Sequence, residues 1–165
     1  MSMKICGRVV KYGEDVNTDV IIPSKYLAFT SPHDLAKHAM EGLDQSFPEK
    51  VRTRKIVVAA KNFGCGSSRE QAPVALKYAG IEAVVADSFA RIFYRNAVNI
   101  GLPVLECPGA AEAIADEDEV EVDIGEGLVQ DLSNGKVLHG NRTPDFLLKI
   151  MEKGLVQYVK EGRSC

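Results

Sequence analysis

Three short runs of apolar residues alternate with two helical stretches in the middle of the chain, and this alternation limits the possible folds more than any other feature. The runs are Ile56–Ala60, Ile81–Ala86 and Leu102–Leu105. One apolar face at helical spacing joins the first two runs, through Ala72, Ala75, Leu76 and Ala79, with Gly80 placed to end the helix. A second such face joins the last two and ends near Gly101, through Phe89, Ile92, Phe93 and Ala97. Fully apolar strands separated by helices predict an α/β fold with a covered parallel sheet and right-handed connections.

The N-terminal third predicts one strand and one helix. Gly7–Tyr12 has the valines of a strand, and the Gly13–Asp15 turn follows it. A helix start is predicted at Ser31, because a serine N-cap, a proline at the first helical position and an early acid follow one another there. The apolar face of that helix would contain Leu35, Ala39 and Leu43.

From about residue 116 the pattern changes to antiparallel structure. Seven acids and no base lie in Asp116–Glu126, but acids alternate with Val120, Val122 and Ile124, which favours a half-exposed strand over a cation site. An Asn-Gly turn joins Leu128–Leu132 to Val137–His139 and predicts a hairpin. A final helix is predicted from Pro144 to about Lys160, interrupted near Gly154. We therefore expect one domain, residues 1–165, with a parallel βαβ core and a hairpin-rich part.

Charge and cysteine spacing exclude several classes of function. The net charge of −3 argues against nucleic acid and against an anionic membrane surface, and no apolar stretch approaches the length of a membrane span. Four cysteines (6, 65, 107 and 165) and three histidines lie too far apart in sequence for a zinc site, an iron–sulfur cluster or a disulfide framework. We expect no metal or cofactor held by this chain alone, a reducing cytoplasm, and an exposed, unimportant thiol at Cys165.

The segment Asn62–Gln71 carries the chemistry. It follows the first buried strand and opens a helix, where backbone N–H groups favour an anion, and Arg69 adds a fork suited to a carboxylate. Neither the Walker pattern nor a dinucleotide fingerprint is present. Ser67 and Ser68 each fit a capping box with Glu70 or Gln71, so helix capping and an anion site are equally supported by the residues alone.

Three motifs together resemble the aconitase superfamily, and in particular its stand-alone small subunits. They are Gly7–Gly13 running into Asn17–Pro23, then Asn62–Glu70, then Asp87–Asn96. They occur in the family's order and spacing, so the resemblance spans essentially the whole chain. It implies the swivelling β/β/α fold of the aconitase C-terminal domain. It also implies half of a hydro-lyase that is inactive without an iron–sulfur large subunit, as a heterodimer or heterotetramer. A [4Fe-4S] cluster is expected in that partner.

The resemblance also implies roles for individual residues. Ser67 matches the catalytic serine that removes a proton next to a carboxylate, and Asp19 matches an active-site aspartate. Ser68 and Arg69 match substrate-binding positions. Arg91 and Arg95 are expected to be structural, either bonding to carboxylates or facing the partner, and the alternative is that they touch the site. Gln71 stands where many relatives have histidine, and the role of that position stays open.

Substrate choice is expected in the loop after Pro23. Relatives that bind a third carboxylate place an arginine there, whereas this chain has Ala28 between Leu27 and Phe29, which could form an apolar wall. Ordinary packing is the alternative for these residues. We expect interconversion of 2-isopropylmalate and 3-isopropylmalate, a step of leucine biosynthesis. The alternatives are a homoaconitase-type or dimethylmalate hydro-lyase, or a non-catalytic binding module.

Cys65 lies inside the candidate site loop and has two interpretations. A helix N-terminus and Arg69 would lower the pKa of its thiol and make it a nucleophile. The resemblance instead makes Cys65 a small packing residue, which is the favoured interpretation.

Overall fold

The computed structural model describes residues 1–163, so the prediction for Cys165 lies outside the described residues. Seven strands form one sheet in the order β4-β3-β2-β1-β5-β6-β7. β1 (Lys4–Lys11), β2 (Arg54–Ala59), β3 (Ala83–Ala86) and β4 (Val104–Glu106) are parallel. β5 (Glu119–Asp123), β6 (Leu128–Asp131) and β7 (Val137–His139) continue the sheet with antiparallel pairing, beginning against β1. The predicted α/β fold with two kinds of strand pairing is confirmed.

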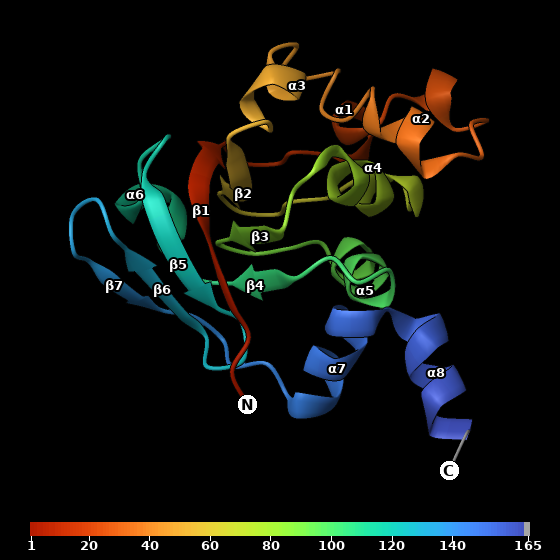
Figure 1. Cartoon of the computed structure of the whole chain (residues 1–165). Helices are drawn as coiled ribbons and strands as arrows, with labels where there is room; N and C mark the ends of the chain where they lie inside the picture. Colours follow the sequence, from red (N-terminus) through yellow and green to blue (C-terminus); the bar gives the residue numbers. More distant parts are fainter. Residues whose placement is uncertain (164–165) are drawn as a thin grey trace.

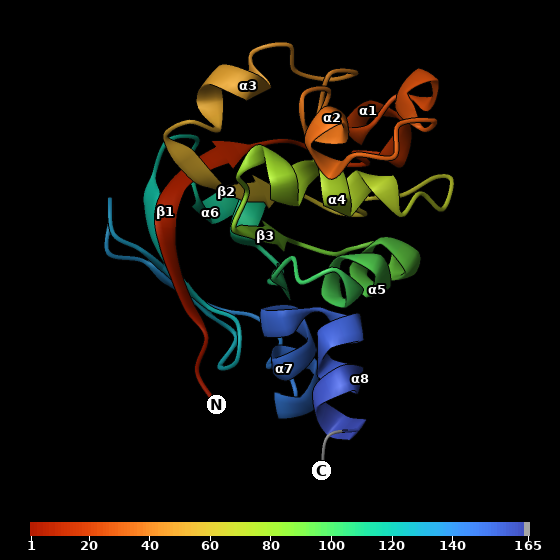
Figure 2. The same ribbon diagram turned by 45° about the vertical axis from the view of Figure 1, so that its right-hand side comes forward.

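The helices of the parallel half lie where the sequence places them. α4 (Gln71–Ala79) and α5 (Arg91–Asn99) connect β2 to β3 and β3 to β4, and they lie beside each other next to the parallel strands (Figures 1 and 2). Gly80 ends α4 in a left-handed conformation, as predicted. α6 (Ala110–Ala113) follows β4, and α7 (Asp145–Lys153) and α8 (Leu155–Arg163) are separated at Gly154 and pack near α5.

The core is formed by the central strands and the helices that cover them. All four residues of β3 are buried, and in β2 the run from Ile56 to Ala59 is buried. Strands that are buried on both faces need helices on both sides, which is why their sequences show no alternation of apolar and polar residues. In β5, by contrast, Val120 and Val122 are buried while Glu119 is exposed. The acidic segment therefore begins as a half-exposed strand, as the alternation predicts.

Short helices and turns connect β1 to β2, and here part of the sequence prediction is wrong. α1 (Thr18–Ile21), the 3₁₀ turn η1 (Ser24–Tyr26), α2 (Pro32–Ala36) and α3 (Phe47–Lys50) replace the longer predicted helix. Ser31 is the N-cap of α2, but its side chain makes no capping hydrogen bond. Met40 adopts a positive φ of 60°, so the chain turns after α2 and Leu43 is 49% exposed instead of continuing the buried face.

One apolar position in the second predicted helix also differs from expectation. α5 begins at Arg91, so Phe89 precedes the helix, and Phe93 and Ala97 define its buried face at i and i+4. Ile92 lies one residue, about 100°, away from Phe93 around the helix and is 51% exposed.

Candidate active site

The loops after β1, β2 and β3 converge at the carboxyl ends of the parallel strands. Asn17 forms an isolated parallel bridge with Cys65, and Phe63 forms one with Phe89. Backbone hydrogen bonds run from Gly64 N to Val16 O at 2.7 Å and from Thr18 N to Cys65 O at 2.9 Å. The glycine loop after β2 is thus held between the two neighbouring loops, at the edge where open α/β sheets bind ligands.

Gly64 allows the loop to pass directly over α5. Its φ is +83°, and a Cβ at this position would lie 2.2 Å from Cγ of Phe93. Phe93 in turn packs edge-on against Phe63, with ring centroids 5.2 Å apart. Only glycine satisfies both the left-handed backbone and this close approach.

Ser67 and Ser68 lie before α4 rather than capping it. The N-cap of α4 is Glu70, which makes no side-chain capping hydrogen bond, and Pro73 fits within the first turn. The capping interpretation of the two serines is therefore wrong. Ser67 is fixed through its backbone, because the buried Thr18 hydroxyl donates to the Ser67 carbonyl oxygen at 2.7 Å.

Arg69 joins the loop to α1. Its guanidinium lies 2.6 Å from the Asp19 carboxylate and donates to the Ile22 carbonyl oxygen at 2.9 Å. Asn17 caps α1 by accepting a hydrogen bond from Val20 N at 3.1 Å, so the helix that carries Asp19 is itself well fixed. Two residues that the sequence predicts to share a site are thus in direct contact.

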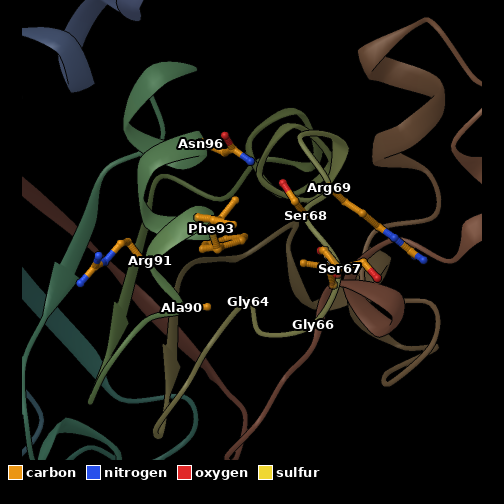
Figure 3. A pocket seen from close by; sticks show the side chains of 11 residues that line it. Gly64, Gly66, Ser67, Ser68, Arg69, Ala90, Arg91, Phe93 and Asn96 are labelled. Carbon is orange, nitrogen blue, oxygen red and sulfur yellow. Dashed lines mark hydrogen bonds between the residues drawn. The ribbon is translucent and has the colours of Figure 1, made fainter.

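A pocket of about 210 Å³ lies between this loop and the start of α5 (Figure 3). Ser67, Ser68 and Arg69 line one side, and Ala90, Phe93 and Asn96 line the other. Figure 3 shows the Ser68 hydroxyl and the Asn96 amide pointing toward one another, while the Arg69 and Arg91 side chains extend in opposite directions. The arrangement offers hydroxyl groups and an amide to a small polar ligand, with two arginines in the lining whose charged ends point away from the centre of the pocket.

Some lining residues are missing from the sequence-based site. Thr18, Phe93 and Asn96 line the pocket, and none of them was predicted to do so. All three residues occur within the first and third motifs. Their place in these motifs is the only feature of the sequence from which they could have been predicted. Arg91 also lines the pocket, and neither Arg91 nor Arg95 forms an ion pair with any residue in the described part of the chain.

The predicted apolar wall lies outside this pocket. Leu27 is partly buried against the core, whereas Ala28 is exposed and Phe29 is 39% exposed. Lys25 is the cationic residue of the same loop, and its Nζ lies 5.1 Å from the centre of the Tyr26 ring. The structure therefore brings Ser67, Ser68, Arg69 and Asp19 together, and Leu27, Ala28 and Phe29 are not among the residues that line the pocket.

The environment of Cys65 does not fit a nucleophile. Burial, with a further contribution from the negative charge of Asp15, raises the pKa of the Cys65 thiol above its ordinary value. The expectation that Arg69 and a helix N-terminus would lower this pKa is wrong, because Arg69 is turned toward Asp19 instead. The packing interpretation of Cys65 is thereby favoured.

Residues 1–163 are the range to which the following absences apply. No group of three or more histidine, cysteine, aspartate or glutamate side chains there is placed to hold a metal ion. In the acidic segment, Asp116 and Glu117 pair with Arg54 instead. No helix in this range has the length and apolar character that a membrane crossing requires.

Comparison with known proteins gives consistent similarities. Residues 22–109 match the family described as the aconitase C-terminal domain. The chain is 52% identical to a 3-isopropylmalate dehydratase small subunit from Ruminiclostridium cellulolyticum, over 98% of this chain and 100% of that one. It is 51% identical to an isopropylmalate/citramalate isomerase small subunit from Methanocaldococcus jannaschii, over 95% and 94% of the two chains. A crystal structure of 3-isopropylmalate dehydratase from M. jannaschii superimposes with a TM-score of 0.91 at 46% identity, covering 98% of this chain and 96% of that one.

Proposed function

Because this chain belongs to the aconitase C-terminal domain family, among the small subunits of 3-isopropylmalate dehydratase, we propose that it is one half of a two-subunit hydro-lyase. The enzyme would interconvert 2-isopropylmalate and 3-isopropylmalate by dehydration and rehydration, in leucine biosynthesis. The single observation that carries the proposal is the contact of the Ser67–Arg69 loop with Thr18 and Asp19 at the pocket. In this proposal residues 1–165 act as one swivelling domain.

Each residue of the Ser67–Arg69 loop has its own role in the proposed reaction. Ser67 would remove the proton next to a substrate carboxylate and return it during rehydration, which needs stabilisation of its alkoxide by nearby N–H groups and positive charge. Arg69, oriented by Asp19 and the Ile22 carbonyl, would bind a substrate carboxylate. Ser68 lines the same pocket and would add a polar contact to the substrate.

The partner in this proposal is an iron–sulfur large subunit, in a heterodimer or heterotetramer. The described residues of this chain offer no ligand set for a cluster, so the [4Fe-4S] cluster is assigned to the partner. The chemistry expected from it is Lewis-acid polarisation of the substrate hydroxyl and a carboxylate. A cytoplasmic location is part of the same proposal and is supported by the free thiols of Cys6, Cys65 and Cys107.

The proposed substrate has an apolar branch, which would be recognised by residues 24–30, called here the specificity loop. This loop contains no arginine, so it lacks the group that the resemblance assigns to a third carboxylate, and its one cation is Lys25. Citramalate, which has a methyl group in place of the isopropyl group, is the second candidate substrate. It is favoured by the name of the 51% identical relative from M. jannaschii.

The test is anaerobic activity on 2-isopropylmalate and on citramalate, with this chain alone, the large subunit alone, and both together. Activity only in the mixture is the expected result. In the mixture, Ser67→Ala should lower kcat by roughly 10²–10⁴-fold, the range for removal of a general base. Ser68→Ala is the matched control, with a smaller loss. A mixture that is silent on every malate derivative would contradict the proposal and favour a non-catalytic module.

A further inference from the structure

The specificity loop is held only weakly by its own backbone. Its hydrogen bonds are local: Tyr26 N donates to Pro23 O, Leu27 N to Ser24 O, and Phe29 N to Tyr26 O. Ser24, Lys25, Ala28, Phe29 and Thr30 are exposed. Tyr26 and Leu27 are the members of this loop that are partly buried against the core. The position of the exposed turn therefore depends on what Tyr26 contacts.

Tyr26 stacks on His38. The two rings are almost parallel, with an interplanar angle of 7° and centroids 3.7 Å apart. The Phe29 ring lies 5.8 Å from the His38 ring and 5.7 Å from the Tyr26 ring. One imidazole thus contacts both aromatic side chains of the loop, and ring pairs at these distances favour one orientation of the side chains over others.

His38 belongs to a segment that is fixed to α1. Met40 N donates to Ile21 O at 2.8 Å, and Gly42 N donates to Val20 O at 3.2 Å. A Cβ at Gly42 would lie 2.7 Å from Cα of Val20, so the two backbones are in direct contact. Since α1 also carries Asp19, the imidazole of His38 and the Asp19–Arg69 pair share one rigid support.

Glu41 contacts both rings of the stack. Its Oε2 atom is buried and lies 3.3 Å from Nδ1 of His38, although this geometry does not make a hydrogen bond. The nearby Glu41 carboxylate, with a further contribution from burial, raises the pKa of the Tyr26 hydroxyl above its ordinary value. The carboxylate thus lies beside both His38 and Tyr26.

We propose that His38 is a positioning residue for substrate selection, which holds the Tyr26–Phe29 turn in the place where it reads the alkyl branch of the substrate. The proposal rests on the proposed function, because it takes the specificity loop as the part that faces the alkyl branch. Arg69 supports that geometry, since it lines the pocket and also donates to the carbonyl oxygen of Ile22, two residues before the loop begins. His38 acts through Tyr26 and Phe29 and has no contact with reacting atoms in this scheme.

The experiment compares His38→Ala, His38→Phe and wild type in the assembled two-subunit enzyme, with 2-isopropylmalate and citramalate as substrates. His38→Ala should lower the ratio of kcat/KM for 2-isopropylmalate to that for citramalate by roughly tenfold, the scale set by a few methyl groups in an apolar pocket. The change should come from KM for 2-isopropylmalate, with kcat and the citramalate parameters close to wild type. His38→Phe keeps a flat ring on which Tyr26 can stack, so this variant should retain most of the wild-type ratio of kcat/KM values.

The matched control is His33→Ala. His33 also contacts a tyrosine, with its ring edge-on to Tyr78 at 5.5 Å, but Tyr78 is not part of the specificity loop. The ratio should be unchanged in this variant. If wild type is active and His38→Ala keeps the wild-type ratio, or loses both substrates equally, the positioning role is wrong while the proposed function stands. A wild-type mixture that is inactive on both substrates would instead overturn the proposed function, and this inference with it.

Discussion

The Asp19 carboxylate lies 2.6 Å from the Arg69 guanidinium, so one ion pair joins α1 to the loop after β2. The Asp19 side chain is 61% exposed, whereas that of Arg69 is only 13% exposed. An ion pair with an exposed carboxylate contributes about 0–1 kcal/mol to stability because water screens it. The pair is therefore better explained as a device that orients Arg69 than as one that holds the fold.

Replacing Asp19 should separate activity from stability. Asp19→Asn should change the free energy of unfolding by less than about 1 kcal/mol. It should lower kcat/KM of the assembled enzyme roughly 100-fold, because Arg69 loses its orientation. Denaturant unfolding of this chain and steady-state kinetics of the mixture measure the two effects. Glu126→Gln, which breaks the exposed pair with Arg142, is the matched control and should leave both unchanged. Wild-type activity in Asp19→Asn would remove Asp19 from the site.

Thr18 should affect the site through a single hydrogen bond. Its buried hydroxyl donates to the Ser67 carbonyl oxygen at 2.7 Å. Thr18→Val keeps the shape but leaves that carbonyl without its donor, so we expect a loss of about 1–3 kcal/mol in unfolding free energy and a lower kcat. Thr18→Ser keeps the hydroxyl and should retain most of both. Wild-type behaviour of Thr18→Val together with a loss in Thr18→Ser would show that the methyl group of Thr18, and not its hydroxyl, positions Ser67.

The sequence predicts those parts of the fold and site that depend on local patterns. Continuous apolar runs predicted β2, β3 and β4, and the Asn-Gly turn predicted the β6–β7 hairpin. The glycine loop predicted that Ser67 and Arg69 follow a buried strand. This was possible because glycines mark the tight backbone conformations of a loop in the local sequence.

Contacts between distant segments were not predictable in the same way. The Thr18–Ser67 hydrogen bond and the approach of Phe93 to Gly64 join residues whose sequence neighbours carry no sign of the other partner. The positive φ of Met40 turns the chain after α2, although the apolar spacing there favours a longer helix. Tertiary hydrogen bonds from Met40 and Gly42 to α1 outweigh that local preference.

A charge placed in the specificity loop tests its proposed role. Ala28→Arg adds a guanidinium at an exposed position, so the fold should tolerate it. The assembled enzyme should gain activity on a homologous substrate with a third carboxylate and lose activity on 2-isopropylmalate, because a cation replaces part of the apolar wall. Relative kcat/KM values for the two substrates measure the change, and Ala28→Leu serves as an uncharged control. An unchanged substrate preference in Ala28→Arg would mean that this loop does not face the substrate.

Asp44 should make part of the stability dependent on pH. Its carboxylate accepts hydrogen bonds from the Tyr12 hydroxyl and Lys50 Nζ, each at 2.9 Å, and from Ser46 N at 3.0 Å. Burial opposes ionisation, but these hydrogen bonds and the charge of Lys50 outweigh it and lower the pKa of Asp44 below its ordinary value of 3.8. The resulting stabilisation is complete above the pKa of the unfolded chain and is lost as the pH falls through the lower folded pKa.

Asp44→Asn should therefore lower the unfolding free energy at pH 7 by about 1–3 kcal/mol, the scale of hydrogen bonds to a charged group. The difference from wild type should shrink as the pH falls below about 4. Urea unfolding at a series of pH values measures both. Asp34→Asn, which removes an exposed carboxylate paired with Lys37, should show almost no difference at any pH. A deficit for Asp44→Asn that stays constant down to pH 2 would show that the carboxylate charge is not its source.

The two glycines of the site loop should differ sharply in their tolerance of a side chain. Gly64→Ala combines left-handed backbone strain of about 1–2 kcal/mol with an overlap against Phe93 that costs about 1–3 kcal/mol more. Gly66 has a φ of +90°, but its Cβ would find its nearest atom at 3.5 Å, so Gly66→Ala should cost the strain alone. Gly135→Ala provides the reference, because Gly135 has a φ of +79° and nothing within 4 Å of the added Cβ. We expect Gly135→Ala and Gly66→Ala to have about the same unfolding free energy. Gly64→Ala should have a clearly lower one. Similar losses in all three variants would mean that Phe93 moves away readily and that α5 does not fix the position of the loop.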